Sequence, residues 1–328
     1  MKIVITGGTG FIGTRLARKL LEKGTVAGPS GAQEKVDEIV LFDVALPPEL
    51  PAGLDDRVTM RQGEIADKAT VDALIDRPDI GVFHLASVVS GGGEKDFDLA
   101  MRVNLDGGRY VLEACRAQGS RPRVLFTSSI ATFGGAAMPD VVGDLVKQTP
   151  QTTYGMTKAV VELMLNDYTR KGFLDGRSAR LPTVIIRPGK PNAAASSFFS
   201  GMFREPLAGV DCKIPVPTDV RHPVIGYRSV VDGILALYEA DSDAIGDDRA
   251  FTLPSTSATV AELMAALERV AGDRPLGKLT VEPDPFIQEI VKTWPRAAGA
   301  DRALALGLPH DNSLDDIVRA YIADYVDV

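Results

Sequence analysis

The chain has 328 residues, of which 45% are hydrophobic and 24% are charged, and its formal net charge is −8. These proportions exclude a disordered chain, a coiled coil and a fibre, and a net acidic chain is poorly suited to bind nucleic acid or an anionic membrane non-specifically. Two cysteines and three histidines exclude a disulfide scaffold and predict no metal site. Because the sequence has no apolar run of 18 residues and no leader pattern after Met1, we expect a cytoplasmic protein without a membrane span.

Apolar runs and amphipathic stretches alternate along the first two-thirds of the chain. Residues 2–6 are rich in β-branched side chains, glycines follow at once, and residues 11–23 have helical periodicity. The predicted strands are 2–6, 38–43, 57–62, 80–85, 122–128 and 180–187, and the predicted helices are 11–23, 68–76, 94–117 and 151–171. This alternation predicts an α/β fold, a Rossmann-type doubly wound parallel sheet with helices on both faces.

The alternation breaks after Pro188, where Pro, Gly, Ala and Ser crowd residues 188–226. Further elements are predicted at 229–240, 250–254, 258–271 and from Ser313 onward. We therefore expect a small interleaved C-terminal α/β substrate lobe. The predicted domains are a dinucleotide-binding domain of residues 1–190, to which 228–256 return, and a lobe of residues 191–227 and 257–328. Residues 25–37 are predicted to be a surface insertion with a turn at 29–31.

A glycine-rich turn joins the first predicted strand to the first predicted helix. Residues 6–13 read TGGTGFIG, and Gly8, Gly10 and Gly13 match the pattern G-x-G-x-x-G. Turns of this kind let the backbone approach a pyrophosphate at the positive end of a helix. The strand and helix on either side make dinucleotide binding a better interpretation than an ordinary tight turn. The predicted contacts from this turn are Gly7, Gly10, Phe11, Ile12 and Gly13.

Asp43 ends the second long strand, where an acidic residue bonds the ribose hydroxyls and repels a 2′-phosphate. No Lys or Arg follows it directly, so NAD is preferred over NADP; the alternative is a strand-end cap. The spacing of 30 residues from Gly13 exceeds the usual value of about 20, and the insertion at 25–37 explains the difference. The segments at the ends of the third and fourth predicted strands are expected to flank the adenine and the phosphates. The residues in question are Glu64, Ile65, Leu85 and Ala86.

Tyr154 and Lys158 lie four residues apart at the start of a predicted helix, so they share one face of it. Ser129 ends the fifth predicted strand, and ligands bind at the carboxyl ends of strands in such sheets. A tyrosine with a pKa near 10 needs about 4 kcal/mol of stabilisation to act as a base near neutrality. A lysine charge about 4 Å away supplies about that amount at an effective dielectric constant of about 20. We therefore expect Lys158 to lower the pKa of Tyr154.

Several short motifs occur in the order found in the extended short-chain dehydrogenase/reductase family, also called the NAD-dependent epimerase/dehydratase family, which the sequence resembles. They are TGGTGFIG (6–13), HLAS (84–87), VNLDG (103–107), TSS (127–129), YGMTK (154–158) and RPG (187–189). The resemblance implies that Tyr154 is the general base, that Lys158 tunes it and holds the nicotinamide ribose, and that Ser129 orients the substrate. It also implies that Asn104 contacts the cofactor region and supports a proton relay, that Pro188 lies against the nicotinamide, and that two long helices pair in a homodimer.

The family contains several activities, so the fold alone does not select one. Ile130 and Ala131 stand where the dehydratases carry Asp-Glu, which makes dehydration a poor interpretation. The strings RPGKPNAAASSF and SGGGE resemble a group that oxidises four-carbon sugar acids such as D-erythronate with NAD. This implies oxidation of the C2 hydroxyl of a small anionic polyhydroxy acid. The predicted substrate contacts are Ser129, Tyr154, Lys190, Asn192 and Arg221.

Three alternatives remain open from the sequence. A nucleotide-sugar epimerase of the same family is the strongest of them. A non-catalytic NAD-binding regulator is weaker, because Tyr154 and Lys158 are both present. A hydroxysteroid dehydrogenase would need an apolar substrate lobe, whereas the predicted lobe carries Ser, Asn, Lys and Arg.

Overall fold

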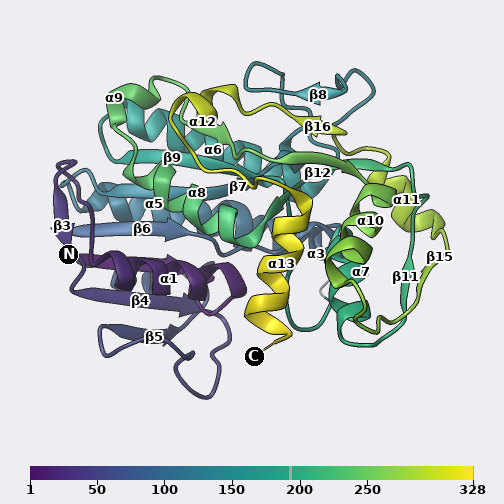
Figure 1. The fold of residues 1–328 in the computed structure, drawn as a ribbon. Coiled ribbons are helices and arrows are strands. Elements are labelled where there is room, and N and C mark those ends of the chain that lie inside the picture. Colours follow the sequence, from purple (N-terminus) through teal and green to yellow (C-terminus); the bar gives the residue numbers. More distant parts are fainter. Residues whose placement is uncertain (192–193, 328) are drawn as a thin grey trace.

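A parallel sheet forms the centre of the computed structural model, which describes residues 1–191 and 194–327. Over these residues the sheet has seven strands in the order β13-β9-β7-β6-β1-β4-β5. Figure 1 labels β9, β7, β6, β4 and β5 of this sheet. Every neighbouring pair in it is parallel. The strands are β1 (Lys2–Thr6), β4 (Glu38–Asp43), β5 (Val58–Gln62), β6 (Ile80–His84), β7 (Arg123–Ser129), β9 (Asp175–Leu181) and β13 (Ala250–Thr252). The predicted doubly wound parallel sheet is confirmed.

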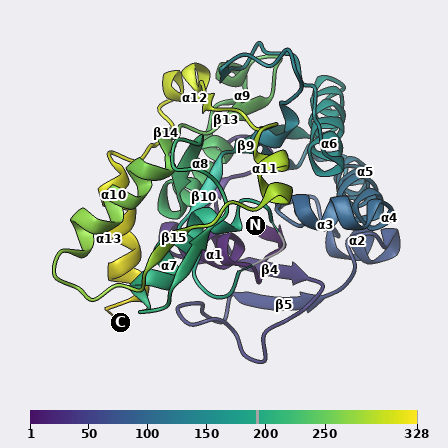
Figure 2. The ribbon, with the colours of Figure 1, turned by 90° about the vertical axis from the view of Figure 1, so that its right-hand side faces the viewer.

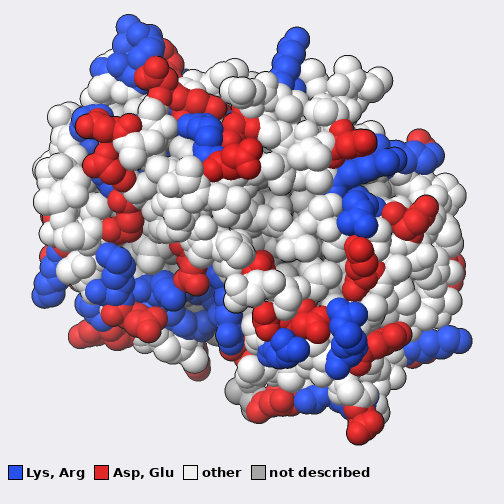
Figure 3. All heavy atoms as spheres, turned by 45° about the horizontal axis from the view of Figure 1, so that its top comes forward, with Lys and Arg blue, Asp and Glu red and all other residues white. Residues whose placement is uncertain are grey.

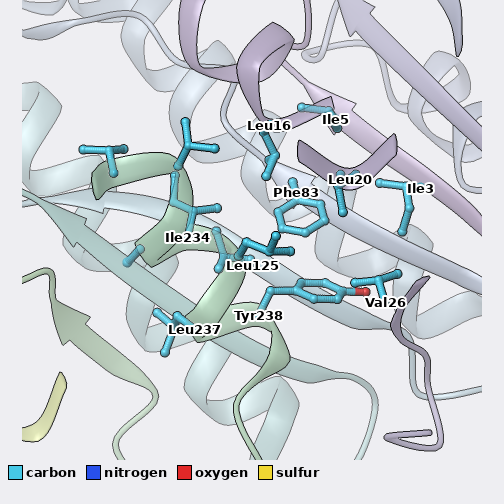
Figure 4. Close-up of a cluster of buried hydrophobic side chains, with 14 of the residues drawn as sticks. Ile3, Ile5, Leu16, Leu20, Val26, Phe83, Leu125, Ile234, Leu237 and Tyr238 are labelled. Carbon is cyan, nitrogen blue, oxygen red and sulfur yellow. The ribbon is translucent and has the colours of Figure 1, made fainter. Parts of the chain in front are cut away.

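Helices cover both faces of this sheet, and Figure 2 shows α5 and α6 on one side and α8 on the other. The helices are α1 (Phe11–Lys23) and α8 (Tyr227–Glu239) on one face, and α2 (Lys68–Leu74), α5 (Gly107–Ala117) and α6 (Thr153–Arg170) on the other. Successive strand residues point to opposite faces. Ile3 and Ile5 therefore pack with α1 and α8, whereas Val4 packs with α2, α5 and α6. Figure 4 shows Leu20 of α1 beside Phe83 in the first of these clusters.

A second unit lies beside the carboxyl ends of the strands and has its own sheet and core. Three described strands form this sheet, β10 (Thr183–Ile185), β12 (Arg221–Gly226) and β14 (Thr256–Thr259). Its helices are α7 (Ser197–Leu207), α10 (Val260–Ala271), α11 (Pro285–Val291) and α13 (Leu314–Tyr325), and β11 (Cys212–Ile214) pairs with β15 (Leu279–Val281). Phe199, Phe203, Leu263 and Ile317 are buried in its core. The last helix begins after Ser313 as predicted, and the Ser313 side chain caps it by accepting from the Asp316 amide.

Smaller elements complete the chain. The predicted insertion at 25–37 is a hairpin of β2 (Thr25–Ala27) and β3 (Gln33–Lys35). The short strands β8 (Val141–Val142) and β16 (Ala297–Ala298) pair with each other and tie the second unit to the loop after β7. The remaining helices are α3 (Ser90–Lys95), α4 (Phe97–Ala100), α9 (Ser242–Ile245) and α12 (Asp301–Ala305), with a π-helical turn (Met101–Asp106) and a 3₁₀ turn (Ile130–Thr132).

Two predicted elements were wrong in their bounds. The helix expected at 94–117 is interrupted, because Asp96 leaves the helical conformation and its side chain caps α4. The strand expected at 180–187 is two strands in different sheets, β9 and β10. Pro182 separates them, and it has no N–H to offer a sheet. This break lets the chain leave the large sheet and enter the small one beside the ends of the parallel strands.

Charged side chains are mixed on the surface. Figure 3 shows Lys and Arg next to Asp and Glu over much of one face. Many are paired, as are Arg15 with Asp324 at 2.7 Å and Arg302 with Asp248 at 3.0 Å. No helix in the described part of the chain is long and apolar enough to cross a membrane.

Candidate active site

A cavity of about 360 Å³ lies where the two units meet. The large sheet contributes Gly10 from the glycine turn, Ser129 from the end of β7, and Tyr154 from the first turn of α6. The second unit contributes Arg187 and Trp294. The glycine turn, Ser129 and Tyr154 therefore face one shared space at the carboxyl ends of the parallel strands, where ligands bind in such sheets.

The glycine turn fits a pyrophosphate by its own geometry. A Cβ atom on Gly13 would lie 2.6 Å from the carbonyl oxygen of Gly8, and one on Gly8 would lie 2.5 Å from that of Ile5. Gly7 has a φ of +67°, and a Cβ atom there would meet the Ala86 amide at 2.9 Å. At Gly10, by contrast, a Cβ atom would meet only the Gly7 carbonyl oxygen, at 3.1 Å. Gly10 lines the cavity with Phe11, Ile12 and Gly13 at the start of α1. The unbonded amides of a first helical turn therefore face a space that no side chain fills, which suits an anion.

Asp43 lies beside this turn at the end of β4. Its Oδ2 accepts from the Thr9 hydroxyl at 2.9 Å and from the Thr9 amide at 3.3 Å, and its Oδ1 accepts from the Val44 amide at 2.9 Å. The carboxylate is half-buried, so it contributes a fixed negative charge beside the turn. Both roles considered from the sequence, a strand-end cap and a ribose ligand, are compatible with this position.

The other predicted cofactor contacts are distributed around the turn. The amides of Leu85 and Ala86 both donate to the Thr6 hydroxyl at 3.2 Å, and Leu85 lines the cavity. Ile65 is buried against Gly107 of α5, whereas Glu64 is exposed. The loop that carries them is joined to β4, because the Gly63 amide donates to the carbonyl oxygen of Asp43 at 3.0 Å.

Ser129 and Tyr154 line the cavity, and Lys158 is buried beside Tyr154. The Ser129 side chain makes a hydrogen bond to the Tyr154 hydroxyl. Lys158 is buried, and its Nζ lies 5.5 Å from the centroid of the Tyr154 ring and donates to the carbonyl oxygen of Thr127 at 2.7 Å. The structure thus brings together the phenol, the hydroxyl and the ammonium that the sequence predicted.

Burial dominates the acidity of both ionisable groups. It raises the pKa of Tyr154, and the hydrogen bond from Ser129 opposes the rise. It lowers the pKa of Lys158 to about 7, and the Glu162 carboxylate opposes the fall. In this arrangement the pKa of the phenol lies above its ordinary value, so the base form of Tyr154 requires nearby positive charge.

Asn104 lies beneath the site and is only 3% exposed. Its Oδ1 accepts from the Val88 amide at 2.7 Å and from the Ser87 hydroxyl at 3.1 Å. Its Nδ2 donates to the carbonyl oxygen of Val88 at 3.0 Å and to Thr157 Oγ1 at 3.3 Å. The amide therefore ties the loop after β6 to α6, next to Lys158. Both its oxygen and its nitrogen are occupied by hydrogen bonds within the protein.

The cationic residues predicted to bind substrate do not line the described part of the cavity. Lys190 is exposed, and Arg221 is exposed and pairs with Glu262 at 3.3 Å. Pro188 is half-buried outside the described lining. Asn192 lies outside the described residues.

Arg187, which the sequence predicts only as part of the RPG motif, is the cation in the described lining of the cavity. Among residues 1–191 and 194–327, no carboxylate forms an ion pair with its guanidinium, whereas Arg204 beside it pairs with Glu205 at 2.5 Å. Burial and the neighbouring Arg204 charge lower the pKa of Arg187. A half-buried cation without an internal counter-ion favours an anionic ligand. The sequence did contain a signal, because Arg187 lies two residues after the end of β10.

The fold and this site define an enzyme of the extended short-chain dehydrogenase/reductase class. The chain belongs to the family described as "NAD dependent epimerase/dehydratase family", whose model matches residues 3–248. NAD is its cofactor, and the expectation of an NAD-dependent dehydrogenase is confirmed.

Two relatives match nearly the whole chain. The chain is 47% identical over 325 residues to D-erythronate dehydrogenase from Cupriavidus necator, covering 99% of this chain and 98% of that protein. It is 38% identical over 322 residues to D-erythronate dehydrogenase from Haemophilus influenzae, covering 98% and 99%. A crystal structure described as a nucleoside-diphosphate-sugar epimerase from Agrobacterium tumefaciens is 39% identical, has a TM-score of 0.90, and matches 100% of this chain and 95% of that one.

Proposed function

We propose that the protein oxidises the C2 hydroxyl of a four-carbon sugar acid of the D-erythronate type to the 2-oxo acid, with NAD as the acceptor. The observation that carries this proposal is Arg187, a cation without an ion-pair partner in the described chain, in the same cavity as Ser129 and Tyr154. The two relatives named D-erythronate dehydrogenase, at 47% and 38% identity, support it.

In the proposed mechanism the substrate carboxylate binds Arg187, whose planar guanidinium can hold both carboxylate oxygens. This leaves the C2 hydroxyl facing Ser129 and Tyr154. Ser129 orients the hydroxyl, and Tyr154 accepts its proton. When bound at the glycine turn, NAD supplies the acceptor for the hydride that leaves C2.

Lys158 is proposed to make the base form of Tyr154 accessible. When protonated, Lys158 places a positive charge 5.5 Å from the centroid of the Tyr154 ring, which favours the phenolate over the neutral phenol. This opposes the effect of burial on the pKa of Tyr154. The carbonyl oxygen of Thr127 holds the ammonium in place, and the negative charge of Glu162 favours its protonated form. Asn104 is proposed to act as a positioning residue, since it braces α6 through Thr157.

The second candidate is the nucleotide-sugar epimerase, and the structure of that description at 39% identity is the observation that favours it. Such an enzyme would return the cofactor to its starting state in each cycle and would release no reduced nicotinamide. A non-catalytic NAD-binding regulator is less well supported, because Tyr154, Ser129 and Lys158 are all present and converge.

The deciding experiment incubates the purified protein with NAD and a panel of three- to six-carbon sugar acids that includes D-erythronate, L-threonate and their stereoisomers. NADH formation and trapping of a 2-oxo acid with one four-carbon acid are the expected result. A UDP-sugar serves as the control. Conversion of the UDP-sugar without oxidation of any acid would overturn the proposal in favour of the epimerase.

The proposed partner is a second copy of the chain, and the proposed compartment is the cytoplasm. Leu163 on the outer side of α6 is 64% exposed, which supports pairing through the long helices. Sedimentation of the wild type and of Leu163→Glu tests the homodimer, which predicts a smaller particle for the variant.

A further inference from the structure

We propose that Thr183 determines substrate specificity, because His222 fixes its hydroxyl as a hydrogen-bond acceptor for a substrate hydroxyl beyond C2. This inference rests on the proposed function and assigns a role to a wall of the same cavity. Thr183 is the first residue of β10 and lines the cavity, and His222 lies on the neighbouring strand β12.

Three groups form a chain of hydrogen bonds behind this wall. Thr183 Oγ1 lies 2.7 Å from His222 Nε2. His222 Nδ1 lies 3.1 Å from the carbonyl oxygen of Pro295, in the segment between α11 and β16. A carbonyl oxygen can only accept, so Nδ1 must carry the ring proton.

His222 is held as the neutral ring. It is 3% exposed, stacks against Phe199 at a centroid distance of 5.3 Å, and contacts Trp294 with tilted rings at 5.0 Å. No carboxylate forms an ion pair with it within residues 1–191 and 194–327. Burial lowers the pKa of His222 to about 4, against the opposing hydrogen bond to Pro295.

The direction of the remaining hydrogen bond follows from this. A neutral ring with its proton on Nδ1 has a lone pair on Nε2, so the Thr183 hydroxyl must donate to Nε2. The Thr183 proton is then occupied by His222 Nε2, so the Thr183 oxygen can only accept a hydrogen bond from a ligand in the cavity. Serine and threonine hydroxyls can usually rotate to donate to or accept from a ligand, whereas the Thr183 hydroxyl can only accept a hydrogen bond from one.

The Thr183 hydroxyl, as an acceptor, complements the hydrogen-bond donors that Arg187 presents in the same cavity. Arg187 presents only donors, which suit a carboxylate, and Thr183 presents an acceptor, which suits an O–H group. A substrate that lacks the matching hydroxyl leaves this lone pair without a partner in a partly dry site. Sites of this kind discriminate strongly against the deoxy analogue, and we expect about a 10- to 100-fold preference in kcat/KM.

The test compares D-erythronate with two analogues, 2,4-dihydroxybutanoate, which lacks the C3 hydroxyl, and 2,3-dihydroxybutanoate, which lacks the C4 hydroxyl. The wild type is expected to prefer D-erythronate over one of them by about 10-fold or more. Thr183→Val, which replaces the hydroxyl by a methyl group, should reduce that ratio to within about threefold. Thr183→Ser is the matched control and should keep most of it. His222→Phe, which removes the acceptor for the Thr183 proton, should also reduce the ratio.

Trp294 provides a measurement of binding that does not depend on turnover, because it is the single tryptophan of the chain and lines the same cavity. In the Tyr154→Phe background saturated with NAD, titration with each acid should change its fluorescence and reproduce the same preference in Kd. Equal kcat/KM and Kd values of the wild type for all three acids would overturn the inference, without the need for any variant. Retention of the wild-type ratio by Thr183→Val would also overturn it. Failure of the wild type to oxidise any of the acids would instead overturn the proposed function.

Discussion

Lys158 donates through Nζ to the carbonyl oxygen of Thr127 across 2.7 Å, which joins α6 to the end of β7. Tyr154 is carried by that helix and Ser129 by that strand. The contact between the phenol and the serine hydroxyl therefore depends on a buried lysine that the same helix provides one turn later. The lysine has two tasks, to hold the two hydroxyls together and to supply positive charge beneath them.

Replacing Tyr154 by Phe is expected to lower kcat for acid oxidation by about 10³-fold, because the proton acceptor is lost. The dissociation constant of NAD should stay within about threefold, since most of the proposed cofactor contacts lie elsewhere. Steady-state NADH formation and calorimetric titration with NAD measure the two quantities. Turnover at the wild-type rate would contradict the role of Tyr154.

Replacing Arg187 by Gln is expected to raise KM for the acid by about 100-fold, the cost of losing a charge-assisted pair with a carboxylate. Arg221→Gln is the matched control, because Arg221 is exposed and already bonded to Glu262. Its KM should change by less than about threefold. Similar effects of the two substitutions would show that Arg187 is not the carboxylate ligand.

Two glycines of the same turn are expected to respond differently to alanine. Gly13→Ala places a Cβ atom 2.6 Å from the Gly8 carbonyl oxygen, so it should lower the free energy of unfolding by about 2 kcal/mol or more. At Gly10 the nearest atom would be the Gly7 carbonyl oxygen at 3.1 Å, and the rest of the space is open cavity. Gly10→Ala should therefore fold but bind NAD about 10-fold more weakly. Urea unfolding and NAD titration separate these outcomes, and tight NAD binding by Gly10→Ala would argue against a pyrophosphate there.

Removing the charge of Asp43 should relax the choice of cofactor. Asn at this position keeps an oxygen that can accept from Thr9, but it no longer repels a 2′-phosphate. We expect the ratio of kcat/KM for NADP to that for NAD to rise about 10-fold in Asp43→Asn. An unchanged ratio would mean that Asp43 only supports the turn.

The stability of the protein should fall as pH decreases from about 6.5 toward 4. Burial, together with the positive charge of Lys158, lowers the pKa of His84 to about 3. Burial lowers the pKa of His222 to about 4. The unfolded chain therefore binds more protons than the folded one in this range, and the free energy of unfolding rises with pH. Reversible urea unfolding between pH 4.5 and 7 measures the slope, which His222→Gln should reduce by about half. A free energy that is constant over this range would contradict the buried neutral state of both rings.

Local patterns in the sequence were sufficient for much of the fold and for part of the site. The bounds of β1, α1 and β4 agree with the prediction, because apolar periodicity and glycine positions act within a few residues. The glycine turn and the spacing of Tyr154 and Lys158 are local for the same reason. The order of motifs along the chain placed them at the carboxyl ends of neighbouring parallel strands, and this required only the rule that such ends share one edge.

The start of β9 could not be predicted in this way. Its first residues include Asp175 and Arg177, which a sequence pattern assigns to the surface. They are buried because Arg123 and Arg249, from distant strands and loops, pair with Asp175 at 3.1 and 2.6 Å. Compensation of a buried charge depends on partners far away in the chain, and no local window contains them.

Which cation of the second unit lines the cavity also depends on residues that are distant in the chain. Arg187 and Arg221 both lie in loops or strand ends with similar composition, and the sequence favoured Arg221 and Lys190. The tertiary structure turns Arg187 into the cavity and leaves Arg221 outside, bonded to Glu262. Sequence therefore determined which kinds of group the protein has and on which elements they lie. Only the packing of β10 and β12 against the large sheet decided which cation is desolvated without a counter-ion, since that depends on what surrounds a side chain in space.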